Sequence, residues 1–328
     1  QLNDPDVLKL NTNENPYPPS PRVFDAVRAA LTTNHLRKYP QPLGDAFRAA
    51  AGRALNVDPD GILIGNGSDD ILTILTRAFV PEGGLVVAPT PSYILYRSLA
   101  EIQGARFRAV PFAAGWQLPE AWPTDGNITF LPNPNSPSGT VVPLAAVERL
   151  AARVAPAPLV LDEAYADFAD DNGLSLVGRV PNLIVTRTLS KAYSLAGIRF
   201  GFAVAGPAVV RELVKVKDSY NCDVLSLAAA AAAVEDQEYF RGVRAKIVAT
   251  RGRMAAELAA LGFDVTPSHA NFLWCRRADR PVKPVYEELK RRKVLVRYMN
   301  YDGYDGLRMT VGTDAEADRL LTELRDIL

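Results

Sequence analysis

A lysine in the second half of the chain is the first residue whose surroundings suggest chemistry. Lys191 follows an expected buried strand at residues 183–187 and precedes an apolar, glycine-bearing segment at 195–201. An amine held between such segments is a candidate for desolvation, which favours the uncharged form that a Schiff-base lysine needs. Most lysines are simply solvated, so Lys191 has to be judged together with its neighbours.

A glycine-rich turn supplies a candidate anion site. The apolar residues 62–64 run into the sequence GNGSDD at 65–70, which is expected to open a helix. Exposed backbone amides and the helix dipole at such a turn attract a phosphate, although a merely structural helix cap would look the same. A Rossmann dinucleotide site fits less well, because the third glycine of its Gly-x-Gly-x-x-Gly pattern is absent.

A carboxylate ends another apolar run. Asp162 follows residues 159–161, and this run has the composition of a buried strand. Ligands bind at the carboxyl ends of parallel strands, so we expect Asp162 to face a site. A helix cap or a surface acid is the alternative interpretation of this residue.

The elements that must position these residues alternate along the chain. From about residue 44, helical and strand patterns follow one another, which is typical of an α/β protein with helices on both faces of a mostly parallel sheet. The expected strands are 62–64, 85–88, 106–110, 127–131, 159–161, 183–187 and 200–204, then 271–275, 294–297 and 307–311. The expected helices are 22–31, 45–55, 69–80, 93–103, 144–154, 208–217, 227–234, 237–261, 282–292 and 314–327.

The chain length predicts two domains. With 328 residues the chain exceeds what one core normally serves. Prolines are dense in the first 44 residues, which predicts a wrapping arm. We expect an N-terminal arm at 1–33 that completes the small domain, a large domain at 34–236, and a small α+β domain at 237–328.

The order and spacing of the anion turn, Asp162 and Lys191 resemble those of the aspartate-aminotransferase-like enzymes, which have fold type I and depend on pyridoxal phosphate. The resemblance covers nearly the whole chain, and its outer motifs narrow it to the histidinol-phosphate aminotransferases of class II. The matching segments are LNTNENPYP at 10–18, RKYP at 37–40, GSDD at 67–70, DEAY at 162–165, SKA at 190–192 and GLRMTVGT at 306–313. The resemblance implies a large domain with a seven-stranded sheet and binding of pyridoxal 5'-phosphate.

The resemblance assigns four residues to the cofactor ring. Lys191 is implied as the Schiff-base partner and proton shuttle. Asp162 is implied to pair with the pyridinium nitrogen and to keep the ring an electron sink. Tyr165 is implied to donate to the ring 3-oxygen, and Tyr93 to stack on the ring face, although core packing would also explain Tyr93.

The cofactor phosphate is assigned in the same way. The resemblance implies contacts from the backbone amides of Ser68 and Asp69, the hydroxyl of Ser190 and the guanidinium of Arg199, all of the same chain. It also implies that Tyr39 reaches this phosphate from the neighbouring subunit, and therefore that the protein is a homodimer with a shared active site.

One segment departs from the family pattern. The family commonly has Asn immediately before Pro-Thr-Gly, but Ser136 occupies this position, in the sequence NPNSPSG at 133–139. We expect Asn135 to supply the amide to the cofactor or substrate instead. Both polar residues could also do no more than form the turn.

Three further residues are implied to bind substrate. Arg308 matches the carboxylate-binding arginine, and Arg297 matches an arginine that helps bind the substrate phosphate. An exposed charge at a strand end is the alternative for Arg297. Tyr17 of the arm is implied to close over the substrate.

The expected activity is amino transfer between histidinol phosphate and 2-oxoglutarate, which yields imidazole acetol phosphate and glutamate in histidine biosynthesis (EC 2.6.1.9). Two alternative activities use the same cofactor. One is an aromatic amino-acid aminotransferase, and the other is a pyridoxal-phosphate-dependent phosphothreonine decarboxylase. A non-catalytic cofactor-binding regulator is a third class, but it normally needs a DNA-binding extension with a basic arm.

Composition excludes several other partners. The 37 basic and 37 acidic residues give zero net charge, so no overall field attracts nucleic acid or an anionic membrane. The longest apolar stretch, 224–234, is too short for a membrane span. With two cysteines and two histidines in all, we expect no metal site and no disulfide framework, and hence a cytoplasmic location.

Overall fold

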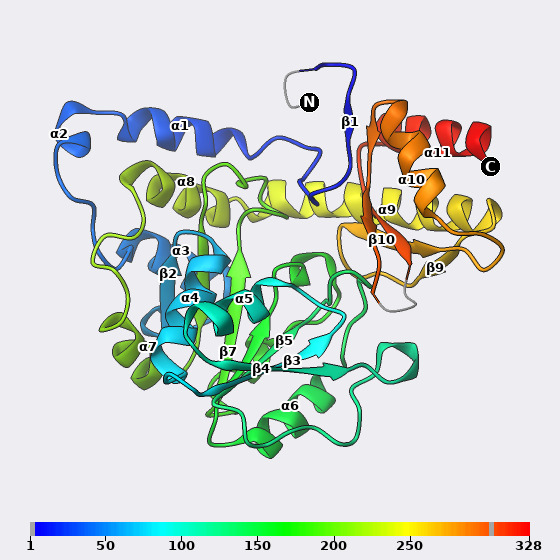
Figure 1. Ribbon diagram of the computed structural model, residues 1–328. Helices are drawn as coiled ribbons and strands as arrows, with labels where there is room; N and C mark the ends of the chain where they lie inside the picture. Colours follow the sequence, from blue (N-terminus) through cyan, green and yellow to red (C-terminus); the bar gives the residue numbers. More distant parts are fainter. Residues whose placement is uncertain (1–3, 302–304) are drawn as a thin grey trace.

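The computed structural model describes residues 4–301 and 305–328 and contains a central seven-stranded sheet (Figure 1). Its strand order is β2-β8-β7-β6-β5-β3-β4. The strands from β7 to β4 pair in parallel, whereas β8 runs antiparallel to both β2 and β7. The strands are β2 (Ile62–Gly65), β3 (Leu85–Thr90), β4 (Arg106–Pro111), β5 (Ile128–Pro132), β6 (Leu159–Asp162), β7 (Leu183–Thr188) and β8 (Gly201–Val204). The expected fold class, α/β with a mostly parallel seven-stranded sheet, is confirmed.

Side chains that alternate along the strands build a core on each face of this sheet. On β6, Val160 packs in one cluster, whereas Leu159 and Leu161 pack in the cluster on the other face. This period of two is the geometry of a strand buried on both sides. The surrounding helices are α3 (Asp45–Leu55), α4 (Ser68–Phe79), α5 (Leu95–Ile102), α6 (Leu144–Val154), α7 (Pro207–Val214) and α8 (Val224–Glu235).

The C-terminal part forms a second, four-stranded antiparallel sheet in the order β12-β13-β10-β9. The long helix α9 (Gln237–Ala260) leads into it, and α10 (Lys283–Arg291) and α11 (Asp314–Ile327) accompany it (Figure 1). Its strands are β9 (Asp264–Thr266), β10 (Phe272–Arg276), β12 (Arg297–Met299) and β13 (Gly306–Thr310).

The N-terminal arm contacts both parts of the molecule. Its strand β1 (Leu8–Lys9) pairs in parallel with β11 (Val294–Leu295), while its helix α1 (Pro21–Ala30) packs against α8. The single strand expected at 294–297 is therefore wrong, because this segment is divided between β11, which pairs with the arm, and β12, which pairs with β13. The domain boundaries at 33/34 and 236/237 stay a proposal.

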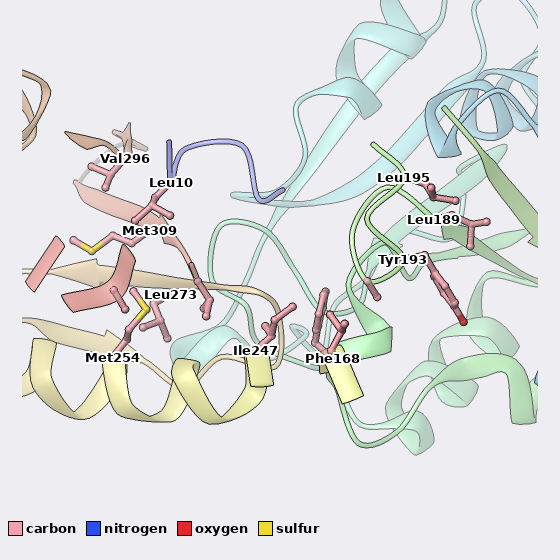
Figure 2. Packing of buried hydrophobic residues seen from close by; sticks show 14 of the residues in the cluster. Leu10, Phe168, Leu189, Tyr193, Leu195, Ile247, Met254, Leu273, Val296 and Met309 are labelled. Atoms are coloured by element: carbon pink, nitrogen blue, oxygen red, sulfur yellow. The ribbon is translucent and has the colours of Figure 1, made fainter. Parts of the chain in front are cut away.

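One apolar cluster joins the small sheet to the segment that carries Lys191. Figure 2 shows Leu10 and Met309 beside Met254 of α9, and the cluster continues past Phe168 to Leu189 and its neighbours. Because protein interiors are close-packed, this shared core fixes the small sheet relative to residues 189–195.

A membrane-spanning helix is absent from the described residues, none of whose helices combines the necessary length and hydrophobicity. Within the same described ranges, His, Cys, Asp and Glu side chains form no group of three or more that could bind a metal ion.

Candidate active site

Asp162, Lys191 and the glycine-rich turn at 65–70 come together where β2, β6 and β7 end. These three strands run in the same direction, since β6 and β7 are parallel and β2 and β7 are both antiparallel to β8. Asp162 is the last residue of β6, Lys191 follows β7, and the turn after β2 opens α4. The carboxyl ends of the strands therefore bring residues from three distant segments to one edge.

Asp162 is buried, with 5% of its surface exposed. Its Oδ2 accepts a hydrogen bond from the Tyr96 hydroxyl at 2.7 Å, and its Oδ1 accepts from the Thr186 hydroxyl and the Ala164 N–H, both at 3.3 Å. Burial raises the pKa of the Asp162 carboxyl, nearby Asp69 adds to the rise, and the three hydrogen bonds oppose it.

Lys191 is partly buried and faces Tyr165. Its Nζ lies 5.9 Å from the centre of the Tyr165 ring and donates a hydrogen bond to the Thr12 carbonyl at 3.1 Å. The Tyr165 ring packs edge-on against Phe272 of the small sheet, with ring centres 4.9 Å apart. The Tyr165 hydroxyl accepts a hydrogen bond from Asn13 Nδ2 at 2.9 Å, so its own proton remains available for another acceptor.

The turn before α4, Ser190 and Arg199 form the candidate phosphate site. Arg199 Nη1 donates to the Ser190 hydroxyl at 3.4 Å, and its Nη2 lies 3.6 Å from Asp69 Oδ2. Gly67 is the N-cap of α4, and a Cβ built there would meet Arg199 Nη2 at 2.7 Å. The guanidinium therefore lies against the helix N-terminus, where backbone N–H groups and the helix dipole also favour an anion.

Tyr93 lies beside this turn at the edge of the site. Its hydroxyl donates to Asp69 Oδ1 at 3.2 Å, and its ring meets Tyr96 edge-on at 5.7 Å. Burial, and then the Asp69 carboxylate, raise the pKa of Tyr93, so its hydroxyl keeps its proton.

Two arginines lie opposite each other on adjacent strands of the small sheet. Arg297 on β12 is the cross-strand partner of Arg308 on β13. Arg308 Nη2 donates to the Asn11 carbonyl at 3.2 Å, while its buried Nε has no hydrogen-bond partner. Burial, and then the charge of Arg297, lower the pKa of Arg308, with Tyr165 acting in the opposite sense. Neither arginine forms an ion pair among the described residues. Paired cations of this kind form a site for anions.

Asn135 and Ser136, in the turn that differs from the family pattern, have different hydrogen-bond partners. Ser136 Oγ accepts a hydrogen bond from Arg308 Nη1 at 2.8 Å. Asn135 Nδ2 donates to the Ser138 hydroxyl within the turn and to the Pro91 carbonyl of the segment after β3, and its buried Oδ1 has no hydrogen-bond partner. The structure thus brings Ser136 to the predicted carboxylate site, and a cofactor contact of Asn135 stays a prediction.

Two predicted site residues lie outside this cluster. Tyr17 packs beside α9, where Lys246 Nζ lies 5.2 Å from its ring centre. Tyr39 is 80% exposed and stacks on Tyr220 at 4.5 Å. Their roles towards substrate and towards a second subunit stay predictions.

Sequence reasoning missed four residues that hold the predicted ones. Asn13 contacts Tyr165, Asn15 Nδ2 donates to the carbonyls of Lys191 and Ala192, and Tyr96 and Thr186 donate to Asp162. The polar run at 11–15 was a usable signal, because uncharged polar side chains so dense in an arm need partners. Tyr96 gave no such signal, since its spacing is that of a core residue on a helix.

A family model described as aminotransferase class I and II matches residues 5–324. The chain is 53% identical to the histidinol-phosphate aminotransferase of Rhodopirellula baltica, over 95% of this chain and 87% of that protein. It is 49% identical to the histidinol-phosphate aminotransferase of Syntrophotalea carbinolica, over 97% and 92% of the two chains.

Solved structures show the same fold. The histidinol-phosphate aminotransferase from Sinorhizobium meliloti in complex with pyridoxal-5'-phosphate superposes with a TM-score of 0.87 at 27% identity, over 97% of this chain and 91% of that one. The enzyme from Clostridium acetobutylicum superposes with a TM-score of 0.89, over 97% and 98% of the two chains, and at 20% identity it supports the fold alone.

Proposed function

The chain belongs to the aminotransferase class I and II family, and on that premise we propose that it is a pyridoxal-phosphate-dependent histidinol-phosphate aminotransferase. It exchanges an amino group between histidinol phosphate and 2-oxoglutarate, a step of histidine biosynthesis. The two cysteines, Cys222 and Cys275, are free and buried, which agrees with a cytoplasmic location.

One observation carries this proposal: Lys191, Asp162 and the Gly67–Arg199 anion site converge at one edge of the sheet. An aldehyde, a ring nitrogen and a phosphate are the three groups of pyridoxal phosphate that these residues would hold. The donor set fits the cofactor, since an amine, an acid and a cationic N-terminal turn are each of the required type. When bound, the cofactor supplies an electron sink for the bonds of the substrate α-carbon.

The other roles in the reaction are assigned to individual residues of the chain. Lys191 Nζ would hold the cofactor through its aldehyde carbon and, once the substrate amine has displaced it, would move the proton that leaves the substrate α-carbon. Asp162 would hold a proton on the ring nitrogen, and the free hydroxyl proton of Tyr165 would be donated in a hydrogen bond to the ring oxygen. Tyr93 covers the ring face. The phosphate would be bound by the backbone amides of Ser68 and Asp69, the hydroxyl of Ser190 and the guanidinium of Arg199.

Substrate binding is assigned to the two arginines of the small sheet. Arg308 binds the carboxylate of glutamate with its planar guanidinium, next to Ser136, and Arg297 binds the phosphate of histidinol phosphate. Because they are cross-strand neighbours, one pocket serves both anions in turn. Tyr17 closes this pocket.

The functional unit in this proposal is a homodimer with a shared active site. Tyr39 is a large aromatic residue with most of its surface exposed, beside the exposed Tyr220. An exposed aromatic pair of this kind suits a subunit interface. In that interface Tyr39 would reach the cofactor phosphate of the second copy.

Lys191→Ala tests the catalytic assignment. The variant is expected to lose the visible absorbance of the lysine-bound cofactor and at least about 10³-fold in transamination, because no other amine replaces it. Absorbance spectra, together with borohydride reduction and mapping of the modified residue, measure the first. Retention of the lysine-bound absorbance by the variant would contradict the assignment.

A steady-state comparison separates the activity from its alternatives. Histidinol phosphate, phenylalanine and phosphothreonine are each offered with 2-oxoglutarate, and both glutamate formation and carbon dioxide release are measured. We expect the highest kcat/KM for histidinol phosphate. A preference for phenylalanine would support an aromatic aminotransferase, and carbon dioxide release from phosphothreonine would support the decarboxylase.

Arg297→Gln tests the substrate phosphate site. The loss of a charge-assisted contact is expected to raise KM for histidinol phosphate about tenfold or more, with KM for glutamate little changed. Arg308→Gln is the matched variant and should raise KM for glutamate. Equal effects of both variants on both substrates would show that the arginines do not divide the two anions.

A further inference from the structure

Tyr96 lies under the site with its hydroxyl on the Asp162 carboxylate, and we infer that it is a positioning residue that sets the orientation and ionisation of Asp162. This inference rests on the proposed function, because it concerns how Asp162 meets the ring nitrogen of the cofactor. Tyr96 itself touches neither substrate nor cofactor in this proposal and acts through Asp162.

Packing alone does not explain a tyrosine at this position. Tyr96 is fully buried, and its ring stacks on Phe130 with centres 4.9 Å apart and planes 8° apart. A phenylalanine ring would make the same stack. The hydroxyl is the part that needs an explanation, since a buried hydroxyl without a partner is costly. Its partner is Asp162 Oδ2 at 2.7 Å, across 66 residues of sequence.

Hydrogen bonds to both oxygens of Asp162 fix the orientation of its carboxylate plane. Oδ2 receives the proton of Tyr96, and Oδ1 receives those of Thr186 and Ala164 N. A tyrosine hydroxyl carries one proton, so Tyr96 acts as the donor while Asp162 is ionised. The two oxygens are thus anchored separately, which leaves the carboxylate little freedom to rotate.

No cation compensates the buried charge of Asp162 among the described residues. The ionisable groups that face it are Asp69 of α4, which opposes ionisation, and Tyr93 and Tyr96 from the segment after β3, while Tyr165 faces both tyrosines. Burial raises the pKa of Asp162, and the hydrogen bond from Tyr96 is the strongest influence that lowers it. Removing this hydroxyl leaves the neutral acid favoured up to higher pH, and a neutral acid cannot pair with a pyridinium ring.

Tyr96→Phe tests the inference with pyridoxamine phosphate as the probe. This ligand has the ring and phosphate of the cofactor but forms no bond to Lys191. Its affinity for the cofactor-free protein is measured by titration calorimetry from about pH 5 to about pH 9. We expect binding at neutral pH to weaken about tenfold, and the acidic limb of the affinity profile to move to higher pH. Unchanged affinity with an unmoved limb overturns the inference.

Tyr193→Phe is the matched control. Tyr193 is also a buried tyrosine, stacked on Phe240 at 4.7 Å, and its hydroxyl meets the Gln237 side chain rather than Asp162. The loss of this hydroxyl should leave both the affinity and the acidic limb as in the unmodified protein. An equal shift in both variants would mean that any lost buried hydroxyl has this effect, and would overturn the inference.

A double-mutant cycle shows whether Tyr96 acts through Asp162. In an Asp162→Asn background, Tyr96→Phe should change the affinity less than about twofold, because the carboxylate that it positions is gone. A full tenfold loss in that background contradicts the inference. If Tyr96→Phe does not fold, Thr186→Val is measured in its place. A smaller shift of the acidic limb to higher pH supports the role of the hydrogen bonds to the Asp162 carboxylate. An unmoved acidic limb overturns the inference.

The outcomes separate this inference from the proposed function. If the unmodified protein binds no cofactor and borohydride fixes nothing on Lys191, the proposed function fails. If the unmodified protein binds normally and Tyr96→Phe binds equally well, only the inference fails.

Discussion

Asp162 is buried at the large sheet and Arg308 is partly buried on the small sheet, and neither has an ion pair among the described residues. A charge withdrawn from water without a partner costs stability, and such groups concentrate where a ligand brings the missing charge. The contrast within the chain is Arg187, whose buried guanidinium pairs with Glu163 at 2.8 Å and with Asp167 at 2.6 Å. The charge of Arg187 is compensated within the protein, whereas in the proposed function Asp162 and Arg308 would pair with a ring nitrogen and a carboxylate of bound ligands.

The pH dependence of stability should show this cost at Asp162. Because burial raises its pKa, the folded cofactor-free protein keeps a proton at pH values where the unfolded chain has released it. The stability from this group is complete below the ordinary carboxyl pKa and is lost as pH rises through the raised value. Asp162→Asn should therefore become more stable than the unmodified cofactor-free protein as pH rises through this window. Urea unfolding at a series of pH values from about 4 to about 8 measures the difference.

Asp125 provides the opposite case as a control. The hydrogen bonds from exposed Arg108 lower the pKa of its carboxyl. Its contribution is present above the ordinary carboxyl pKa and is lost as pH falls through the lowered value. Asp125→Asn should then lose stability at neutral pH rather than gain it. A difference of the same sign at both positions would argue against the assigned cause at Asp162.

At the scale of elements, the phosphate site depends on a turn and a loop held in uncommon backbone conformations. Gly67 precedes α4 with φ +87°, and the loop after β7 holds Ser194 at φ +60° and Arg199 at φ +56°. Residues other than glycine are rare at such φ values, and strained residues of this kind cluster at functional sites. Lys191 and Arg199 both lie between β7 and β8, so one loop presents the Lys191 amine and the Arg199 guanidinium of the candidate phosphate site together.

Gly67→Ala tests the fit between this turn and Arg199. The added Cβ would lie 2.7 Å from Nη2, and alanine is strained at this φ. We expect a loss of about 1–3 kcal/mol in the free energy of unfolding, and about tenfold weaker binding of pyridoxal phosphate as the guanidinium is displaced. Gly206→Ala is the control, since Gly206 also caps a helix but has φ −58° and open space around it. Equal cofactor affinity of the two variants would contradict the close fit.

At the scale of the whole molecule, the site lies between two sheets that three consecutive arm residues connect. The Asn11 carbonyl accepts from Arg308, the Thr12 carbonyl accepts from Lys191, and the Asn13 side chain donates to Tyr165. The arm thus holds Arg308 of the small sheet and Lys191 and Tyr165 beside the large sheet at fixed separation.

Subunit complementation tests the proposed shared site. Tyr39→Ala and Lys191→Ala would each lack a different contribution to every site of their own homodimer. After subunit exchange, half of the sites in a mixed dimer combine an intact Lys191 with an intact Tyr39, so about a quarter of all sites should recover. The assay is run at low cofactor concentration, where the loss of Tyr39 matters most. A mixture no more active than the average of its two components would speak against sharing.

Local patterns were sufficient for much of the fold. The helices expected at 45–55 and 144–154 have those same limits in the structure, because caps and apolar periodicity act within a few residues. The proposed cofactor residues were likewise chosen from short motifs, and the ends of β6 and β7 bring Asp162 and Lys191 to one edge of the sheet. Strands β1 and β9, of two and three residues, were missed because so short a run has no period to detect.

What the sequence left open was settled by contacts between distant segments. Tyr96 reaches Asp162 across 66 residues, and Asn13 reaches Tyr165 across 152. Ser136 rather than Asn135 meets Arg308, because the Asn135 amide donates to Ser138 within the turn and to the Pro91 carbonyl of a distant segment. A motif specifies which side chains are present. Which of them share hydrogen bonds depends on how sheets and arm pack, and that is a property of the folded chain as a whole.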